Sequence, residues 1–472
     1  MKLRVISFLL LVVFLVPSAL TGCLAAYATE DAGVSYSYIE EIQAVSVAAD
    51  ALKLSGVNAV SMGNHGANQN RVVSVSSGMY LGVMLEPTDG YTNEEVQATI
   101  IRVNADGTAD LIYKDFIADY GATTVTIMAD KNEDIWMYSG WENGNYLFFK
   151  VWQYDVSENK TTAFETVQAI KGSDGAYGYS TAVIDPENEK IFAMAPGGGV
   201  PGWFCWCEFD MVTKEWLPYK TVQTPYRYCY NYAYPDGDGG ILIVGERDIQ
   251  NRSVESNISK LLVVDAMSQL RSRKIDADYM WDELYLIHIP DPAIESLVEV
   301  ELEGATYDVE NGIYPNIKNN GYGDTFLDSN GNLHTLYTTD DDGVAGVYMN
   351  HKIYDVSEGL KEIYSNRITF LYGDNTTYGA RMFEDLEGNV YILAAPHHAR
   401  SQVEVWKATD DLNTKYKLVH NEFLQGVGNR ENGGMILANN RNNSTPSNTA
   451  SFILSLGTWY AFTIDLTPFA DR

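Results

Sequence analysis

The sequence predicts an all-β chain of about seven repeated units, because one aspartate recurs along it and short strands follow that aspartate at a fixed distance. A polar or glycine-containing turn comes after each aspartate, and an apolar strand begins five or six residues on. The aspartates are Asp130, Asp185, Asp236, Asp328 and Asp385, at intervals of 55, 51, 92 and 57 residues. Aspartate caps such a turn with its own side chain and glycine tolerates positive φ, so each aspartate is expected to mark a β-hairpin.

Two further strand-like runs separate successive hairpins, for example Tyr146–Tyr154 and Thr161–Val167. Four short strands in about 50 residues are typical of one blade of a β-propeller. Hairpins that lack the aspartate, at Val72–Gly78 and Gly433–Leu437, bring the count of units to seven. We therefore predict a β-propeller of about seven four-stranded blades, with six or eight as the alternatives, over residues 59–472. The long interval is expected to hold an insertion at about residues 276–315, whose two strand-like pieces could form another blade.

The first residues indicate export. Lys2 and Arg4 precede an apolar run, Val5–Leu20, which is short for a membrane span and typical of a signal peptide. Leu20-Thr-Gly-Cys23 resembles the lipobox of bacterial lipoproteins. That resemblance implies a signal peptide over residues 1–22, lipidation of Cys23, and an anchor segment over residues 23–58. The protein is then expected to be membrane-anchored at the cell surface or periplasmic face. Cleavage after Ala28 by an ordinary signal peptidase is the alternative.

Composition limits the partners and cofactors. With 32 basic and 63 acidic residues, the net charge is −31, which argues against nucleic acid as a ligand. Cys205 and Cys207 share one strand face and are expected to be buried thiols, with a disulfide from either to Cys229 as the alternative. The aspartate turns resemble calcium loops, but turn capping is the preferred interpretation. No cofactor is therefore expected, structural calcium is left open, and a monomer is expected.

A family resemblance is carried by the segment Asn320–Tyr337, which reads Asn-Gly-Tyr-Gly-Asp-Thr-Phe-Leu-Asp-Ser-Asn-Gly-Asn-Leu-His-Thr-Leu-Tyr. It resembles a blade of the BNR-repeat propellers, which include sialidases and propeller-type polysaccharide lyases such as those acting on ulvan. The resemblance extends over most of residues 65–465 as a blade pattern. The sialidase motifs Ser-x-Asp-x-Gly-x-x-Trp and Arg-Ile-Pro are absent, so sialidase activity is not expected.

Propeller topology predicts which loops share a binding face. Loops leading into the first strand of a blade, and loops joining its second and third strands, lie together on the face opposite the aspartate turns. Arginine and tyrosine recur in these loops, and arginine binds carboxylates and sulfates bidentately. The expected substrate-binding residues are Arg71, Tyr120, Tyr177, Arg227, Tyr322, Arg381, Arg400 and Arg430. The alternative is that the tyrosines pack blades together and that each arginine pairs with a nearby acid.

Candidate catalytic residues are His65, His398, Tyr228 and Tyr230. The lyases that the chain resembles use a histidine or tyrosine to remove the proton beside a uronate carboxylate, and histidine has a suitable pKa. A glycoside hydrolase would instead need two carboxylates, for which Glu142, Asp324 and Glu431 are available. The expectation is a surface lipoprotein that acts on or binds an anionic, uronate-type polysaccharide or oligosaccharide. A non-catalytic propeller that serves as a receptor or scaffold is the alternative.

Overall fold

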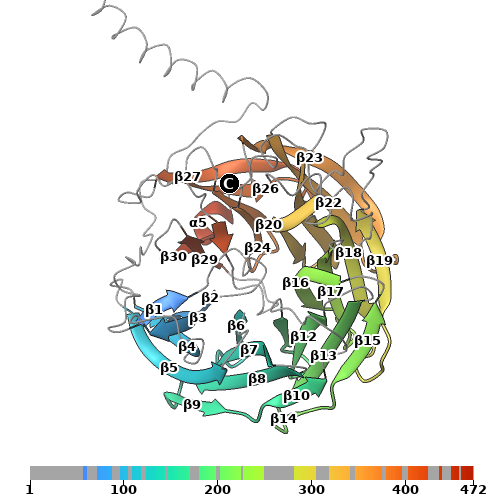
Figure 1. Cartoon of the computed structure of the whole chain (residues 1–472). Coiled ribbons are helices and arrows are strands. Elements are labelled where there is room, and N and C mark those ends of the chain that lie inside the picture. The colour runs from blue at the N-terminus through green and yellow to red at the C-terminus, as the bar shows by residue number, and fades with distance from the viewer. Residues whose placement is uncertain are drawn as a thin grey trace, which may run out of the picture.

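The strands form a ring of sheets around a central axis (Figure 1), so the predicted β-propeller is confirmed. The computed structural model describes residues 57–60, 72–87, 96–104, 109–118, 124–143, 146–170, 180–197, 202–224, 227–248, 281–303, 318–340, 346–374, 379–395, 402–423, 435–437, 448–455 and 459–470. Within these residues there are seven sheets, six with at least four strands and one with three. No helix in this part of the chain is long and apolar enough to cross a membrane.

The first three blades each contain five strands, because one of the four strand positions is divided in two. Blade 1 consists of β1 (Val57–Val60), β2 (Val72–Val75), β3 (Gly78–Pro87), β4 (Val96–Val103) and β5 (Ala109–Ala118). Blade 2 consists of β6 (Thr124–Ala129), β7 (Ile135–Asn143), β8 (Tyr146–Asp155), β9 (Lys160–Ala163) and β10 (Val167–Ile170). Blade 3 consists of β11 (Thr181–Asp185), β12 (Lys190–Gly197), β13 (Gly202–Asp210), β14 (Glu215–Trp216) and β15 (Lys220–Thr224).

The remaining blades follow the same antiparallel order from the axis outward. Blade 4 consists of β16 (Arg227–Pro235), β17 (Ile241–Asp248), β18 (Trp281–Ile289) and β19 (Val298–Glu303). Blade 5 consists of β20 (Lys318–Leu327), β21 (Asn332–Asp340), β22 (Gly346–Asp355) and β23 (Lys361–Asp374). Blade 6 consists of β24 (Gly379–Glu384), β25 (Val390–Ala395), β26 (Gln402–Ala408) and β27 (Tyr416–Phe423). Blade 7 consists of β28 (Met435–Leu437), β29 (Thr449–Ser455) and β30 (Trp459–Asp465), followed by the helix α5 (Thr467–Ala470).

The ring closes through contacts between inner strands of neighbouring blades, and finally between β2 of blade 1 and β29 of blade 7. Apolar side chains fill the space between adjacent sheets. One cluster joins blades 1 and 2 around Tyr80 and Trp152, and another joins blades 5 and 6 around Leu336 and Trp406. The inner strand β11 is buried along its whole length, whereas the third strand β8 alternates between buried and less buried residues.

All five recurring aspartates lie in the first hairpin of their blades, as predicted. In four of them one carboxylate oxygen accepts backbone N–H groups two and four residues on, as Asp328 Oδ1 does from Asn330 (3.0 Å) and Asn332 (2.8 Å). The second oxygen accepts a side-chain donor. In blades 2, 5 and 6 that donor lies six residues after the aspartate, and it is Trp136 Nε1, His334 Nε2 or Tyr391 Oη. The glycines of the last two turns have positive φ, 80° at Gly331 and 82° at Gly388, as this turn chemistry requires.

The segment predicted to be an insertion, at about residues 276–315, contributes two strands to blade 4 instead. Its two strand-like pieces are β18 and β19, which pair with β17 and with each other as the outer strands of blade 4. The extra length of this repeat is accounted for by the connection between Asp248 and Trp281. β18 thus supplies hydrogen-bond partners for the backbone groups on the outer edge of β17.

Candidate functional site

The face opposite the aspartate turns is the candidate binding face. In blades 2–6 the inner strand begins there and runs toward the aspartate turn, and the second strand returns to it. We call it the strand-start face. Near this face, the pairing of three inner strands with their neighbours is interrupted.

The irregularities occur at the same level in three blades. In blade 4, β16 makes four regular pairs with β17, counted from the aspartate turn, before the register shifts between Cys229 and Tyr232. In blade 5, β20 makes four pairs with β21 before a larger shift between Asn319 and Asp324. In blade 1, β2 makes four pairs with β3, and the inner position is resumed only by β1. Bulges of this kind re-aim side chains and are common beside active sites.

The three breaks lie on opposite sides of the axis. Blades 4 and 5 are neighbours, and in a ring of seven sheets blade 1 lies across the axis from them (Figure 1). A linear ligand that crosses the axis would therefore meet a broken inner strand at each side.

Several predicted site residues lie at these breaks in the backbone. Tyr230 lies within the shift of β16, and Tyr322 within that of β20. Arg227 begins β16, and the register places the next residue, Tyr228, opposite Arg247 of β17. The segment between β1 and β2 carries His65 and Arg71 in the sequence. The described backbone thus places Tyr230 and Tyr322 within the two register shifts, and Arg227 at the start of β16.

Two predicted residues are deeply buried. Tyr228 has 0% exposure, and its ring centroid lies 5.9 Å from that of Tyr285, in the core between blades 3 and 4. Arg381 has 1% exposure and donates from Nη1 to the carbonyl oxygen of Ala380 at 2.7 Å. Tyr228 therefore contributes to packing between blades, while the roles predicted for both residues stay predictions.

Other predicted residues lie outside the described residues. These are His65, Arg71, Tyr120, Tyr177, His398, Arg400, Arg430 and the lipidation site Cys23. The backbone is described for Arg227, Tyr230 and Tyr322, but their side chains are not. Cys205 and Cys207 are buried free thiols, as preferred from the sequence, and Cys207 Sγ donates to the Leu217 carbonyl at 3.0 Å.

The carboxylate Asp324 connects two inner strands. It is fully buried and follows the break in β20 directly. Its Oδ2 accepts the backbone N–H of Met382 in β24 at 2.7 Å, and its Oδ1 accepts the N–H of Thr325 at 2.8 Å. Among the carboxylates that a hydrolase could use, Asp324 is thus engaged in holding blade 5 against blade 6.

Glu404 is a titratable group that the sequence analysis missed. It lies near the start of β26, opposite Ala394, and therefore toward the strand-start face of blade 6. Burial raises the pKa of its carboxyl, and the Trp406 indole N–H, 2.9 Å from Oε2, partly opposes that rise. A raised pKa suits a general acid. No sequence signal marks Glu404, since it stands in an ordinary strand run, Gln402–Ala408.

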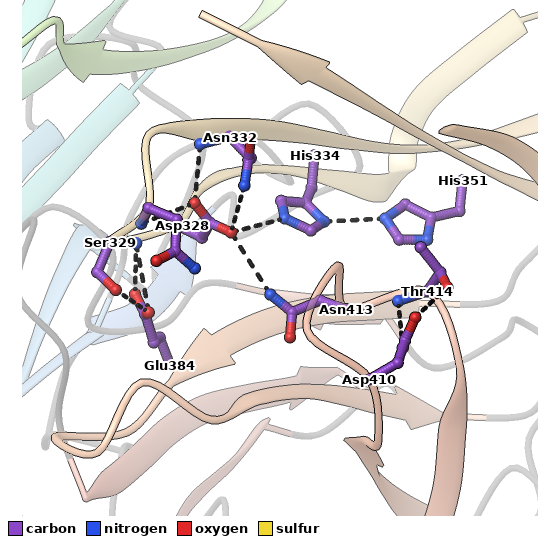
Figure 2. Close-up of polar contacts among 10 residues, drawn as sticks. Asp328, Ser329, Asn332, His334, His351, Glu384, Asp410, Asn413 and Thr414 are labelled. Atoms are coloured by element: carbon purple, nitrogen blue, oxygen red, sulfur yellow. Dashed lines mark hydrogen bonds and ion pairs between the residues drawn. The ribbon is translucent and has the colours of Figure 1, made fainter. Parts of the chain in front are cut away.

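The Asp-turn face carries a different polar network, shown in Figure 2. Asp328 Oδ2 lies 3.2 Å from His334 Nε2, and His334 Nδ1 lies 2.9 Å from His351 Nε2. Asn413 of blade 6 also reaches Asp328, at 3.4 Å. Both histidines are buried, and the whole chain of contacts crosses from blade 5 to blade 6.

Two hydrogen bonds connect Asp328, His334 and His351 in a row. The pKa of Asp328 is lowered, because hydrogen bonds and charge interaction with His334 and hydrogen bonds from Asn332 outweigh its burial, so it is an acceptor. His334 donates from Nε2 to it, and His334 Nδ1 shares a hydrogen bond with His351 Nε2. His351 Nδ1 is buried and has no hydrogen-bond partner in the structure. Burial, with a smaller contribution from His334, holds the pKa of His351 well below its ordinary value. The network is a structural connection between blades rather than a substrate site.

Metal ligation has no support among the described residues, which contain no group of three or more histidine, cysteine, aspartate or glutamate side chains placed to hold an ion. The aspartate turns use their carboxylate oxygens on backbone N–H groups and on neighbouring side chains instead. This supports turn capping as the role of those aspartates.

Comparison with known proteins supports the fold. No family model and no curated protein matches the chain. Among solved structures, the polysaccharide lyase Uly1 has a TM-score of 0.50 at 14% identity, covering 92% of this chain and 99% of that one. An ulvan lyase bound to -[GlcA(1-4)Rha3S]- has a TM-score of 0.50 at 11% identity, covering 87% of this chain and 95% of that one. At such low identity these similarities show a shared propeller architecture.

Proposed function

We propose that this chain is an extracytoplasmic, lipid-anchored protein that binds a uronate-type polysaccharide across the strand-start face and cleaves it by β-elimination. The observation that carries the proposal is the alignment of three inner-strand breaks at one level, on opposite sides of the axis. Support also comes from the sequence, which concentrates arginine, tyrosine and histidine in the loops of that face. The two solved structures with a similar fold are those of polysaccharide lyases.

In the proposed reaction a neutral histidine, His65 or His398, removes the proton from the carbon that bears the carboxylate. The electron pair forms a carbon–carbon double bond, and the glycosidic C–O bond at the adjacent carbon breaks. A tyrosine then protonates the leaving oxygen, and burial of Tyr228 makes Tyr230 the first candidate. Arg227 or Arg71 would stabilise the negative charge that develops on the carboxylate.

The experiment incubates the purified chain with ulvan, alginate and polygalacturonate, and with neutral arabinan for comparison. β-Elimination produces unsaturated products that absorb in the ultraviolet, together with new reducing ends. New reducing ends without that absorbance would instead support hydrolysis, for which Glu404 is the candidate acid. Binding without cleavage would support the non-catalytic receptor. If none of the polysaccharides is bound or cleaved, the proposal is wrong.

The role of arginine is tested by Arg227→Ala, with Arg367→Ala on the outermost strand of blade 5 as the control. Loss of one charge-assisted contact costs about 1.5–3 kcal/mol, roughly a ten- to hundredfold loss of affinity for a uronate oligosaccharide. Neutral oligosaccharides should bind Arg227→Ala and the parent chain equally. Equal losses for acidic and neutral sugars would assign Arg227 to the fold.

A further inference from the structure

Three aromatic side chains gather at the strand-start end of blade 2. Trp141 lies near the end of β7 and faces Phe148 of β8 in the register. Their rings are nearly parallel, at 10°, with centroids 5.4 Å apart. The ring of Tyr146, at the start of β8, lies 6.4 Å from Phe148 at an angle of 58°. We call Trp141, Tyr146 and Phe148 the aromatic shelf.

The inner part of the aromatic shelf is explained by packing. Trp141 packs against the core between blades 1 and 2, and a cross-strand aromatic pair stabilises a hairpin. Tyr146 is less covered, since it lies at the start of β8 between Asn143 and Ile170 in the register and is 42% exposed. An exposed tyrosine ring presents an apolar face to solvent, on which a sugar ring can stack.

Charge near the aromatic shelf is compensated. Further along β8, Lys150 Nζ lies 2.7 Å from Asp115 Oδ2 of blade 1, and Trp152 Nε1 donates to the same oxygen at 2.8 Å. The ammonium and the carboxylate thus neutralise each other at the boundary between blades 1 and 2. Lys150 is therefore already paired with a carboxylate, and the contact that Tyr146 offers a ligand is with an apolar ring face.

The position of the aromatic shelf relates it to the inner-strand breaks around the axis, which we call the axial site. β8 is the third strand outward in blade 2 (Figure 1), and the side of blade 2 that carries Lys150 and Trp152 is turned toward blade 1. In blade 1 two strands, β1 and β2, share the inner position beside β3. A chain that crosses the axis from blades 4 and 5 toward blade 1 would continue toward the aromatic shelf.

We propose that the aromatic shelf is a distal subsite, at which Tyr146 stacks against the C–H face of a sugar ring of the same polysaccharide. This inference rests on the proposed function, since it requires that a polysaccharide occupies the strand-start face. The subsite lies away from the axis, so it acts on long chains and not on short ones. It would hold the polymer in place without taking part in bond cleavage.

The test compares binding of size-graded ulvan oligosaccharides, from disaccharide to the longest available, to the parent chain and to Tyr146→Ala. Stacking on one aromatic ring contributes about 0.5–1.5 kcal/mol, so affinity for long oligosaccharides should fall by up to roughly tenfold. Affinity for the disaccharide should not change, and Tyr146→Phe should restore long-chain binding. Leu386→Ala is the control, because Leu386 is 68% exposed but lies in an aspartate turn on the other face.

The outcomes separate the two proposals. If the parent chain binds ulvan oligosaccharides but Tyr146→Ala binds long and short ones as the parent does, the distal subsite is wrong and the proposed function stands. An equal loss for short and long oligosaccharides would also overturn the subsite, because the substitution would then act on the axial site or on the fold. If the parent chain binds no oligosaccharide of any length, both proposals fail.

Discussion

The buried pair His334–His351 predicts how stability depends on pH. His351 is neutral in the folded protein, because its pKa is held well below 6.5 by burial and by His334. In the unfolded chain the same ring binds a proton below about pH 6.5. The unfolded state therefore binds more protons as pH falls, and the free energy of unfolding decreases below that pH.

The magnitude follows from one proton. A single linked proton changes the free energy of unfolding by about 1.4 kcal/mol per pH unit. Because of His351 alone, the free energy of unfolding should therefore decrease by about 2 kcal/mol between about pH 6.5 and about pH 5. The substitution His351→Leu removes this group and leaves His334 Nδ1 without its partner. At about pH 7.5 we expect a destabilisation of roughly 1–3 kcal/mol. The difference in free energy of unfolding between His351→Leu and the parent chain should be smaller by about 2 kcal/mol at about pH 5.

The measurement is urea unfolding followed by tryptophan fluorescence, for which the chain has nine tryptophans. The pH range stays above that in which Asp328, with its lowered pKa, begins to bind a proton. Thr335→Val is the matched control, because Thr335 follows His334 in β21 and its hydroxyl is buried without a hydrogen-bond partner. Its stability curve should run parallel to that of the parent. The reasoning is refuted if the His351→Leu curve also stays parallel across the whole range.

Three further predictions concern the turns, the thiols and the anchor. Asp385→Ala removes the acceptor of the Asn389 N–H and the Tyr391 hydroxyl, so the free energy of unfolding in urea should fall by about 2–4 kcal/mol. Asp385→Asn should lower it by less, and equal losses for the two variants would contradict the turn-capping role. Burial raises the pKa of the Cys205 thiol to about 12, so Cys205 should react with iodoacetamide only after unfolding, as peptide mass spectrometry would show, whereas labelling of the folded chain would contradict its burial. Cys23→Ala should release the protein from the membrane fraction, and a variant that stays membrane-bound would rule out the lipid anchor.

The fold could be predicted from the sequence because its determinants are local. Each aspartate bonds to backbone groups two to four residues away, as at Asp130 and Asp328, so the turn appears in the sequence at a fixed spacing. The outer strands of blade 4 were harder to assign. β18 follows β17 only after a connection between Asp248 and Trp281, and its partner is set by long-range pairing.

The candidate site could be predicted only in part. Residue types and topology predicted Arg227, Tyr230 and Tyr322 as site residues; the structure gives the backbone position of each, in β16 or β20, and their roles stay predictions. The inner-strand breaks were missed because a register shift depends on the facing strand and leaves no mark within one segment. Glu404 and His351 were missed for a related reason, since the pKa of each depends on burial by residues distant in sequence.

The aspartate turns have a consequence for how this repeat can diverge. The carboxylate is retained in blades 2, 5 and 6, while its partner is an indole, an imidazole and a phenol in turn. In blade 4 the partner is His288 of another strand, 2.9 Å from Asp236. A hairpin that keeps its acceptor and exchanges its donor preserves its shape while losing sequence identity. Repeats of this type are therefore better described by a pattern of hydrogen-bond roles than by a consensus of residue names.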